Sequence, residues 1–336
     1  MLFFRAPLRS LLVAGALAAL SLAGCGNAKP ETFRAVIITD THIIGPQYTC
    51  CHENSDADNS SIVKTVDRLK ALRDTVNAIR PAPAMVLVSG DIVHAAHASR
   101  DPAYYQANET AYSIARDLFK GFNMPVYLAM GNHDYEIDCG SSDTFDPAFS
   151  EARFKELLDT PPFQAVDYHG WKFLLTNSQR GTTFDVNGGH CRTEDASVGK
   201  EQMDWASAQL DEGKPTVILS HFMRLLYSEL ETGPFVSFPK LLDAHTNVQA
   251  WFAGHSHRWV DLTGFNNDVP HWVLGGTRYD ANNFWLVEME EGTSKLTILD
   301  QNKAIMGNSC GSAWSYDGAP MPIANAVDTG DCVSGF

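Results

Sequence analysis

Short apolar runs alternate with amphipathic stretches along the chain from Glu31 to about Lys303. Apolar runs bounded by Gly, Pro, Asp or Asn are typical of buried strands, and amphipathic stretches between them are typical of helices. This alternation predicts an α/β fold. The predicted strands are Phe33–Thr39, Met85–Ser89, Val126–Met130, Trp171–Asn177, Val217–Ser220, Val248–Ala253, Trp272–Leu274, Phe284–Glu288 and Leu296–Leu299.

One predicted helix lies between the first two of these strands. Its apolar residues run from Ile62 to Ile79 and recur mostly every three or four positions, so they share one face of a helix. Ser60 or Ser61 is expected to cap its start, and Pro81 is expected to stop it. Further predicted helices are Ala111–Phe119 and Lys200–Leu210.

Five of the predicted strands end abruptly in side chains that can bind a metal ion. Open α/β sheets place their ligand sites at such strand ends. Imidazole, carboxylate and amide oxygen, without a thiolate, suit borderline and hard divalent metals. The five motifs are Asp40-Thr41-His42, Gly90-Asp91, Gly131-Asn132-His133-Asp134, Ser220-His221 and Gly254-His255-Ser256-His257.

The spacing within these motifs favours two ions over one. Asp40 and His42 stand two positions apart, and residues at that spacing project the same way from an extended segment. His255 and His257 have the same spacing. Asp91 has two carboxylate oxygens and can bridge ions about 3.5 to 4 Å apart.

The order of the five motifs resembles that of the calcineurin-like metallophosphoesterase superfamily, from about Phe33 to Leu299. The resemblance implies a four-layer α/β/β/α sandwich of two mixed sheets, with two ions of Fe, Mn or Zn at the edge of the sheets. It assigns Asp40, His42, Asp91 and His257 to one ion, and Asp91, Asn132, His221 and His255 to the other. The protein is then expected to hydrolyse a small phosphate ester.

The same resemblance assigns the catalytic residues. A water between the ions is expected to lose a proton and attack phosphorus. We predict that His133 protonates the leaving oxygen and that Asp134 orients its imidazole. His94 stands where purple acid phosphatases carry a metal-binding tyrosine, and its Gly-Asp-x-x-His context is similar to phosphodiesterases, where a nearby histidine contacts phosphate. The remaining histidines expected at the surface or in loops are His52, His97, His190 and His271.

This similarity favours a phosphodiester as the substrate. Two alternatives stay open. One is a phosphomonoesterase, which would use the same metals with different surrounding loops. The other is a non-catalytic, metal-binding scaffold outside the cytoplasm, although relatives of that kind usually lack metal ligands that are present here.

The first residues predict export. Arg5 and Arg9 precede an apolar run, Leu11–Leu22, which is the pattern of a secretory signal and is short for a membrane span. Leu22-Ala23-Gly24-Cys25 resembles the lipobox of bacterial lipoproteins, so Cys25 is expected to carry lipid and to hold the protein on a membrane, facing the periplasm or exterior. The predicted parts are a signal peptide (1–24), a tether (25–32), the metallophosphoesterase domain (33–303) and a tail (304–336).

The charge of the chain disfavours a nucleic-acid polymer as partner. The formal net charge is −15, and removal of residues 1–24 with Arg5 and Arg9 changes it to −17. Binding to a phosphate backbone requires clustered basic residues, which this chain lacks. A small phosphate ester drawn to a local metal centre remains compatible with the acidic surface.

Six cysteines remain if Cys25 carries lipid. Adjacent Cα atoms are 3.8 Å apart across a trans peptide, whereas a disulfide needs about 4.4 to 6.8 Å, so Cys50 and Cys51 are not expected to bond to each other. A thiol zinc site is the alternative to disulfides, but no C-x-x-C pair supports it. The predicted pairs are Cys310 with Cys332, which staples the tail, and Cys50 and Cys51 with Cys139 and Cys191.

Overall fold

The structure is a computed structural model that describes residues 30–53, 55–136, 146–181, 195–263, 269–299 and 313–315. The chain divides into two units, Met1–Pro30 and Glu31–Phe336, and every element described below belongs to the second. The predicted signal peptide, Cys25 and most of the tail lie outside the described residues. Within the described ranges, no helix is long and apolar enough to cross a membrane.

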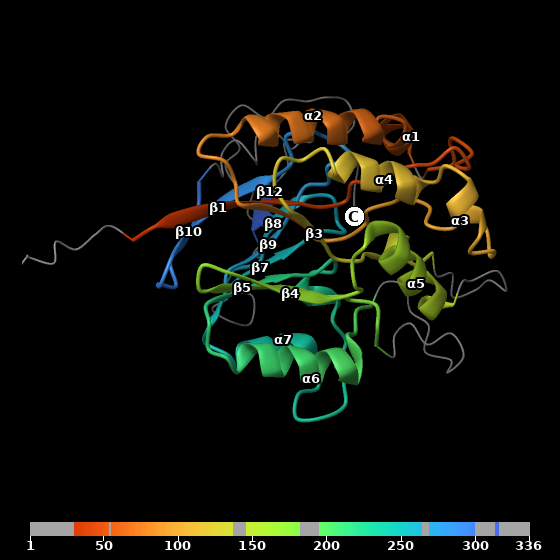
Figure 1. The fold of residues 1–336 in the computed structure, drawn as a ribbon. Helices are drawn as coiled ribbons and strands as arrows, with labels where there is room; N and C mark the ends of the chain where they lie inside the picture. Colours follow the sequence, from red (N-terminus) through yellow and green to blue (C-terminus); the bar gives the residue numbers. More distant parts are fainter. Residues whose placement is uncertain are drawn as a thin grey trace, which may run out of the picture. The chain divides into compact units, whose positions relative to one another are not determined.

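Two sheets form the centre of this second unit (Figure 1). The first contains, in spatial order, β11 (Leu296–Ile298), β10 (Trp285–Glu290), β1 (Thr32–Ile38), β2 (Met85–Val88) and β3 (Val126–Leu128). The second contains β12 (Ala313–Ser315), β8 (Trp259–Asp261), β9 (His271–Val273), β7 (Val248–Ala253), β6 (Thr216–Leu219), β5 (Trp171–Leu175) and β4 (Gln164–Tyr168).

Both sheets are mixed. In the first sheet, β1 pairs with β2 in parallel and with β10 antiparallel, and β2 pairs with β3 in parallel. In the second sheet, β5, β6, β7 and β9 follow one another in parallel, while β4 and β8 pair antiparallel to their neighbours β5 and β9. Two mixed sheets agree with the sandwich that the sequence predicted.

Alternate side chains of the central strands pack on opposite faces of each sheet. In β1, Val36 and Ile38 pack with helix residues, whereas Ala35 and Ile37 pack with strands of the second sheet. In β6, Val217 faces the first sheet, whereas Ile218 lies on the other face and packs with helix residues. Burial on both faces explains why these strands are continuous apolar runs in the sequence.

Helices cover the outer faces of the two sheets and complete the four layers (Figure 1). On the first sheet they are α1 (Asp56–Ile62), α2 (Thr65–Ala78), α3 (Tyr104–Ala107), α4 (Ala111–Phe119) and α5 (Pro147–Leu158). On the second sheet they are α6 (Gly199–Leu210) and α7 (Phe238–Asp243). Helix α4 begins where predicted because Thr110 and Ser113 form a capping box.

The first predicted helix is two helices in the structure. Ser55, not Ser60 or Ser61, caps the start, because its side chain accepts a hydrogen bond from the Asp58 N–H. Ser60 and Ser61 lie inside α1, which ends before Val63, and α2 then runs to Ala78. The periodic apolar face spans both helices and therefore did not reveal the break. The sequence also did not predict α3, α5, α7, β4, β8 or β12.

His271 was expected at the surface or in a loop, and that expectation was wrong. It is the first residue of β9 and is 1 % exposed. Its Nδ1 lies 3.0 Å from the Trp251 carbonyl, and its Nε2 lies 3.2 Å from the Arg224 N–H. Both ring nitrogens therefore have a partner inside the core, and the side chain is the neutral tautomer that donates from Nδ1.

Candidate metal centre

The predicted metal ligands lie at the ends of strands from both sheets. β1, β2 and β3 run parallel in one sheet, and β6 and β7 run parallel in the other. The carboxyl ends of parallel strands lie at the same edge of a sheet, which brings together side chains that are far apart in the sequence. Asp40 and His42 follow β1, Asp91 follows β2, Asn132 follows β3, His221 follows β6, and His255 and His257 follow β7.

Four of these side chains form one group. Potential ligand atoms of Asp40, His42, Asp91 and His257 lie within 4.8 Å of one another. His42 Nε2 is 3.0 Å from His257 Nε2 and 3.4 Å from Asp91 Oδ2. His257 Nε2 is 3.3 Å from Asp40 Oδ1. The structure thus brings together the residues predicted for one ion.

The residues predicted for the other ion meet around Asn132. Its Oδ1 lies 3.0 Å from His221 Nε2 and 3.0 Å from His255 Nδ1. His221 Nε2 lies 3.1 Å from Asp91 Oδ2. A single oxygen of Asp91 therefore faces His42 in the first group and His221 in the second, which is the position that a bridging ligand requires.

The spacing and chemistry of these atoms fit two metal ions. Ligand atoms about 2.1 Å from a shared ion lie about 3.0 to 3.4 Å from one another, close to the contacts seen here. His42 Nε2 and His257 Nε2 lie 3.0 Å apart, so their lone pairs need either a proton or a metal ion between them. The described groups supply imidazole, carboxylate and amide oxygen, a set that suits Zn, Mn and Fe.

Burial and mutual charge set the protonation of the centre. Burial acts to raise the pKa of Asp40 and Asp91, but neighbouring histidines outweigh it, so both pKa values lie below the ordinary range. Burial lowers the pKa of His42 far below its usual value and that of His255 to about 3. Burial also acts to lower the pKa of His221, yet the charge of Asp91 raises it to about 9. The metal-free centre therefore combines two anions with neutral imidazoles at His42 and His255, and with a protonated His221 whose proton a bound metal would replace.

Most of the ligands have an unusual backbone conformation. The φ angle is positive at Asp40 (52°), His42 (45°), Asp91 (50°), His255 (73°) and His257 (57°). Residues with a side chain rarely adopt this region, and each instance costs about 1 to 3 kcal/mol. The conformation turns the chain sharply after each strand and directs the side chain towards the centre.

Backbone hydrogen bonds join the ligand-bearing loops to one another beyond the ends of the strands. The Asp40 N–H donates to the Gly90 carbonyl at 3.1 Å, and the His42 N–H donates to the Asp91 carbonyl at 3.0 Å. The Arg278 N–H donates to the Asp40 carbonyl at 2.9 Å. These bonds involve protein atoms alone, so the loops are held in place by the chain itself.

The glycines of the Gly-Asp and Gly-Asn motifs are needed because the chain packs tightly there. Gly90 has a φ of 113°, and a Cβ on it would lie 2.7 Å from Nδ1 of the His221 ring. A Cβ on Gly131 would lie 2.2 Å from Asp91 Oδ1. Any side chain at either position would displace a predicted ligand.

His133 lies beside the first group. Its Nδ1 is 2.7 Å from the His94 carbonyl, so Nδ1 donates and Nε2 is the nitrogen that gains or loses a proton. Its ring centroid is 4.7 Å from that of His42. Its backbone N–H donates to Asp91 Oδ1 at 2.9 Å. This oxygen faces neither His42 nor His221, so the bond leaves Oδ2 free to bridge the two groups. Burial lowers the pKa of His133.

Asp134 does not orient the His133 imidazole as predicted. Its carboxylate is buried and accepts backbone N–H bonds from Gly131 (2.8 Å), Val93 (3.1 Å) and Ile92 (3.3 Å). The orienting partner of His133 is instead the His94 carbonyl. Burial, followed by the charge of Asp91, raises the pKa of Asp134 to about 7. Asp134 therefore fixes the loops after β2 and β3 to each other.

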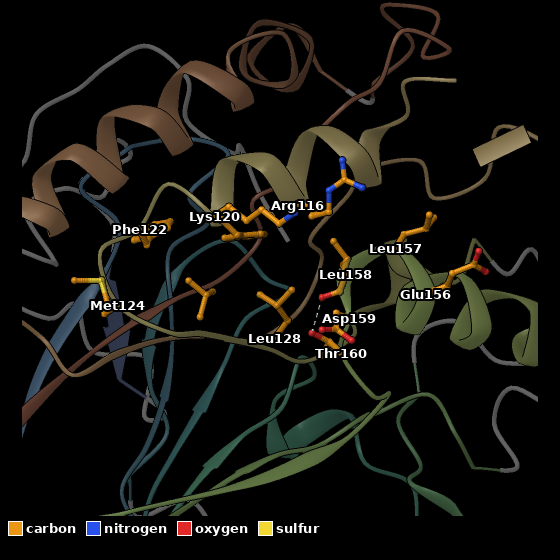
Figure 2. Close-up of a pocket in the computed structure, with 12 residues that line it drawn as sticks. Arg116, Lys120, Phe122, Met124, Leu128, Glu156, Leu157, Leu158, Asp159 and Thr160 are labelled. Carbon is orange, nitrogen blue, oxygen red and sulfur yellow. Dashed lines mark hydrogen bonds between the residues drawn. The ribbon is translucent and has the colours of Figure 1, made fainter. Parts of the chain in front are cut away.

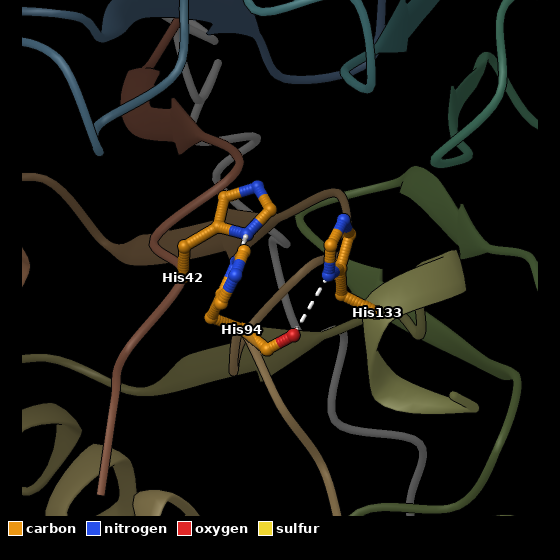
Figure 3. A group of neighbouring side chains, drawn as sticks. All are labelled: His42, His94 and His133. Carbon is orange, nitrogen blue, oxygen red and sulfur yellow. Dashed lines mark hydrogen bonds between the residues drawn. The ribbon is translucent and has the colours of Figure 1, made fainter. Parts of the chain in front are cut away.

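His94 packs against both His42 and His133 (Figure 3). Its Nδ1 lies 3.1 Å from His42 Nδ1, and its ring stacks on His133 with centroids 4.8 Å apart. Its Nε2 lies 3.0 Å from Glu53 Oε1. Both ring nitrogens of the predicted phosphate-contacting residue thus have protein partners.

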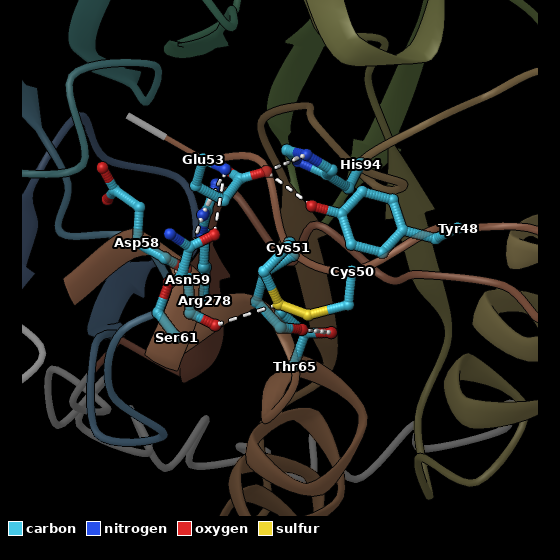
Figure 4. The surroundings of a disulfide bond; sticks show 11 residues. Tyr48, Cys50, Cys51, Glu53, Asp58, Asn59, Ser61, Thr65, His94 and Arg278 are labelled. Atoms are coloured by element: carbon cyan, nitrogen blue, oxygen red, sulfur yellow. Dashed lines mark hydrogen bonds and ion pairs between the residues drawn. A yellow bond between two sulfur atoms is a disulfide. The ribbon is translucent and has the colours of Figure 1, made fainter. Parts of the chain in front are cut away.

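Glu53, Tyr48 and Arg278 surround His94 but were not predicted from the sequence (Figure 4). The Tyr48 hydroxyl donates to Glu53 Oε1 at 2.6 Å, and Arg278 Nη2 donates to Glu53 Oε2 at 2.6 Å. Burial acts to raise the pKa of Glu53, but hydrogen bonds from His94, Tyr48 and Arg278 outweigh it and lower that pKa. Glu53 and Arg278 are 225 positions apart, so no local motif connects them.

The prediction for Cys50 and Cys51 was wrong. The structure joins the two residues in a disulfide, with Cα atoms 3.0 Å apart across a cis peptide, whereas the prediction assumed a trans peptide (Figure 4). They therefore do not pair with Cys139 and Cys191 here. Those two cysteines, Cys310 and Cys332 lie outside the described residues.

A hollow of about 440 Å³ lies away from the metal motifs, between α4, α5 and β3 (Figure 2). Its walls include Phe119, Phe122 and Leu158, and Arg116 and Lys120 also line it. None of the predicted metal ligands or catalytic residues lines this hollow. The candidate site is thus the strand-end cluster.

Comparison with known proteins agrees with the fold and the motifs. A model of the calcineurin-like phosphoesterase family matches residues 33–259, and the chain therefore belongs to this family. The family resemblance predicted from the motifs is confirmed, and the protein is a metal-dependent phosphoric ester hydrolase by family. No curated protein matches the sequence.

The following solved structures match this chain at low sequence identity. A dimetal phosphatase from Danio rerio is 15% identical, with a TM-score of 0.50, and the match covers 77% of this chain and 93% of that one. The purple acid phosphatase PPD1 from yellow lupin is 15% identical, with a TM-score of 0.44 and coverage of 88% and 57%. The NAD nucleotidase NadN from Haemophilus influenzae is 14% identical, with a TM-score of 0.41 and coverage of 88% and 54%.

Proposed function

We propose that this protein hydrolyses a small phosphodiester at a two-metal centre, with His133 as the general acid. The observation that carries the proposal is the position of His133. Its Nδ1 donates a hydrogen bond to the His94 carbonyl at 2.7 Å. Its ring centroid lies 4.7 Å from that of His42, a predicted ligand of the first group. Nε2 is therefore the nitrogen beside the centre that can pass a proton to a leaving oxygen once the ring has taken one up.

The predicted ligands divide into two sets, one for each ion. Asp40, His42, Asp91 and His257 would hold one ion, and Asn132, His221 and His255, with Asp91, would hold the other. When bound, the two ions supply Lewis acidity for the phosphate oxygens and an activated water. Buried carboxylates and fixed imidazoles keep the ligand atoms in place before substrate arrives.

Local charge supports a diester over a monoester. A phosphate monoester carries about two negative charges at neutral pH and a diester carries one, so a monoester needs more cationic partners. Arg278 is the cationic side chain that the described contacts bring next to the centre, and its guanidinium is neutralised by Glu53 at 2.6 Å. With so little free positive charge from the described side chains near the centre, a singly charged phosphate diester fits better than a doubly charged monoester.

The test compares bis(4-nitrophenyl) phosphate with 4-nitrophenyl phosphate. The protein is dialysed against a chelator and reconstituted in turn with Mn, Zn and Fe, and kcat/KM is measured for both substrates. We expect no turnover after chelation, recovery with metal, and a kcat/KM about tenfold or more higher for the diester.

Three outcomes would contradict separate parts of the proposal. A ratio that favours the monoester would overturn the diester preference and would make the protein a phosphomonoesterase. Turnover that survives complete metal removal would overturn the two-metal function itself. Metal bound at two ions per chain without turnover of either ester would favour the non-catalytic scaffold.

A further inference from the structure

A chain of contacts leads from the metal ligand His42 away from the centre. His42 Nδ1 lies 3.1 Å from His94 Nδ1, and His94 Nε2 lies 3.0 Å from Glu53 Oε1. Glu53 Oε2 then accepts from Arg278 Nη2 at 2.6 Å. Figure 4 shows the outer part of this chain, in which Glu53 stands between Arg278 and His94. His94 and Glu53 side chains are only 10% and 13% exposed.

An ionised Glu53 together with a neutral His94 fixes the direction of every hydrogen bond in this chain. An ionised carboxylate can only accept, so His94 Nε2 must donate to it. A neutral His94 then has its lone pair on Nδ1, which accepts from His42 Nδ1. His42 consequently carries its own proton on Nδ1, and its Nε2 lone pair faces Asp91 Oδ2 and His257 Nε2.

We propose that Glu53 and His94 are positioning residues that set the tautomer of His42 and thereby make His42 Nε2 a metal ligand. The assignment rests on the proposed two-metal function. It gives His94 a role behind a metal ligand instead of one against the phosphate. Partners of this kind behind ligating histidines fix ring orientation and raise ligand basicity.

The contacts from His42 through His94 to Glu53 are called the relay below. Arg278 connects this relay to the loop that bears Asp40. Its guanidinium contacts Glu53, the Ser61 hydroxyl (2.8 Å) and the Asp58 carbonyl (3.1 Å), and its side chain is 4% exposed. Its backbone N–H donates to the Asp40 carbonyl at 2.9 Å. The residue that orients the carboxylate of the relay therefore also holds a ligand-bearing loop.

The position of His94 leaves little freedom for its ring. One face stacks on His133 with an interplanar angle of 23°, and the Tyr48 ring meets it edge to face at 5.3 Å. Its backbone carbonyl also accepts from His133 Nδ1 at 2.7 Å. A change at Glu53 is thus expected to act through the proton position on His94 more than through movement of its ring.

Glu53→Gln tests the direction of these hydrogen bonds with little change in the shape of the side chain. The glutamine amide would turn its oxygen to the Arg278 guanidinium and its NH2 to His94, because two donors cannot face each other. His94 Nε2 would then accept, His94 Nδ1 would donate, and the proton of His42 would be displaced to Nε2. We expect affinity for one of the two ions to fall about 10- to 100-fold.

Glu151→Gln is the matched control. Glu151 Oε1 also accepts from a tyrosine hydroxyl, that of Tyr135 at 2.7 Å, and from an arginine, Arg180 Nε at 2.8 Å. Its side chain is 18% exposed, similar to Glu53, and none of the hydrogen bonds described for it goes to a histidine. Both variants thus lose one carboxylate between a tyrosine and an arginine, and only one of them touches the relay.

Metal affinity is measured by competition with a chromophoric zinc chelator, and metal content by elemental analysis. We expect Glu53→Gln to retain one tightly bound zinc and one weakened zinc, and Glu151→Gln to match the wild type at both. Equal affinities in Glu53→Gln and the wild type would overturn the relay. A third zinc that is lost in His94→Gln would also overturn it, since His42, His94 and His133 would then be ligands of another ion.

Nitrogen NMR of imidazole-labelled wild-type protein tests the tautomers without any variant or substrate. We expect His94 to be protonated on Nε2 in the metal-free and zinc-loaded protein, and His42 to be protonated on Nδ1 in the zinc-loaded protein. A proton on His94 Nδ1 would overturn the proposal. Correct tautomers in a protein with no ester turnover would instead leave the relay intact and contradict the proposed function.

Discussion

At the scale of single residues, most of the predicted metal ligands are held in conformations that their side chains disfavour. Asp40, His42 and Asp91 have φ angles of 52°, 45° and 50°. Each costs about 1 to 3 kcal/mol and persists only where the surrounding structure enforces it. The enforcement is visible in the backbone bonds between these loops. The backbone therefore sets the direction in which each of these side chains points, before any metal is bound.

The general-acid role is testable by the dependence on the leaving group. His133→Asn keeps a donor near the position of Nδ1 for the His94 carbonyl but has no counterpart of Nε2. We expect kcat for alkyl phosphodiesters to fall about 10²- to 10⁴-fold, because a basic leaving alkoxide needs a proton. The loss with nitrophenyl diesters should be much smaller, since nitrophenolate leaves without one.

The measurement is kcat against leaving-group pKa for the wild type and His133→Asn. His169→Asn is the control, because His169 is a largely exposed histidine at the turn between β4 and β5. A variant that loses the same factor for every leaving group would show that His133 acts on binding or structure and not on proton transfer.

The sequence could predict which side chains meet at the centre, because each follows an apolar run and belongs to a short motif. It could not predict Glu53 and Arg278, whose contact spans 225 positions and has no motif. Asp134 was assigned to His133 because the two are neighbours in sequence. The true partner of His133 is a backbone carbonyl, and backbone carbonyls leave no signature in a sequence.

At the scale of elements, prediction succeeded where a strand is buried on both faces. All four residues of β2 and all five of β5 are buried, and both strands were predicted within two residues of their ends. β4 was missed because none of its residues is buried and its exposed residues include the polar Asp167. The break between α1 and α2 was missed because the apolar periodicity continues through it.

Packing of β9 against β7 creates a pH dependence of stability. Burial lowers the pKa of His271 to about 3, whereas its pKa in the unfolded chain is about 6.5. Below about pH 6.5 the unfolded chain binds a proton that the folded chain does not. Stability is therefore full above that pH and falls as the pH drops towards 3, by about 2 kcal/mol at pH 5.

Urea unfolding of the chelator-treated protein, repeated from pH 7.5 to 4.5, measures this contribution. His271→Gln should be less stable than the wild type at pH 7.5, but the difference should shrink by about 2 kcal/mol at pH 5. Other histidines titrate equally in both proteins and cancel from the difference. Two parallel stability curves would show that His271 does not remain neutral in the folded core.

At the scale of the whole molecule, the metal centre joins the two sheets. Asp40, Asp91 and Asn132 follow strands of the first sheet, and His221 and His255 follow strands of the second. Ions bound there would crosslink two sheets that otherwise meet through the apolar core between them. A ligand that binds only the folded state adds stability in proportion to the logarithm of its concentration over its Kd.

Metal removal should therefore lower the Tm without unfolding the protein. At a free ion concentration about 1,000 times Kd, binding contributes about 4 kcal/mol per site, which corresponds to a shift of about 10 °C. Far-UV circular dichroism should stay unchanged, because the loops are joined by their own hydrogen bonds. Calorimetry and dichroism with and without chelator measure both effects, and loss of the dichroism spectrum on chelation would contradict this expectation.

Those hydrogen bonds between the loops also bear on how the protein acquires its ions. Asp40 bonds to Gly90, His42 bonds to Asp91, and Arg278 bonds to Asp40 through protein atoms alone. A folded chain can then load and release ions without passing through an unfolded state. Its metal content would follow the supply in its surroundings, and the metal that works in the cell would be decided by availability as much as by the ligands.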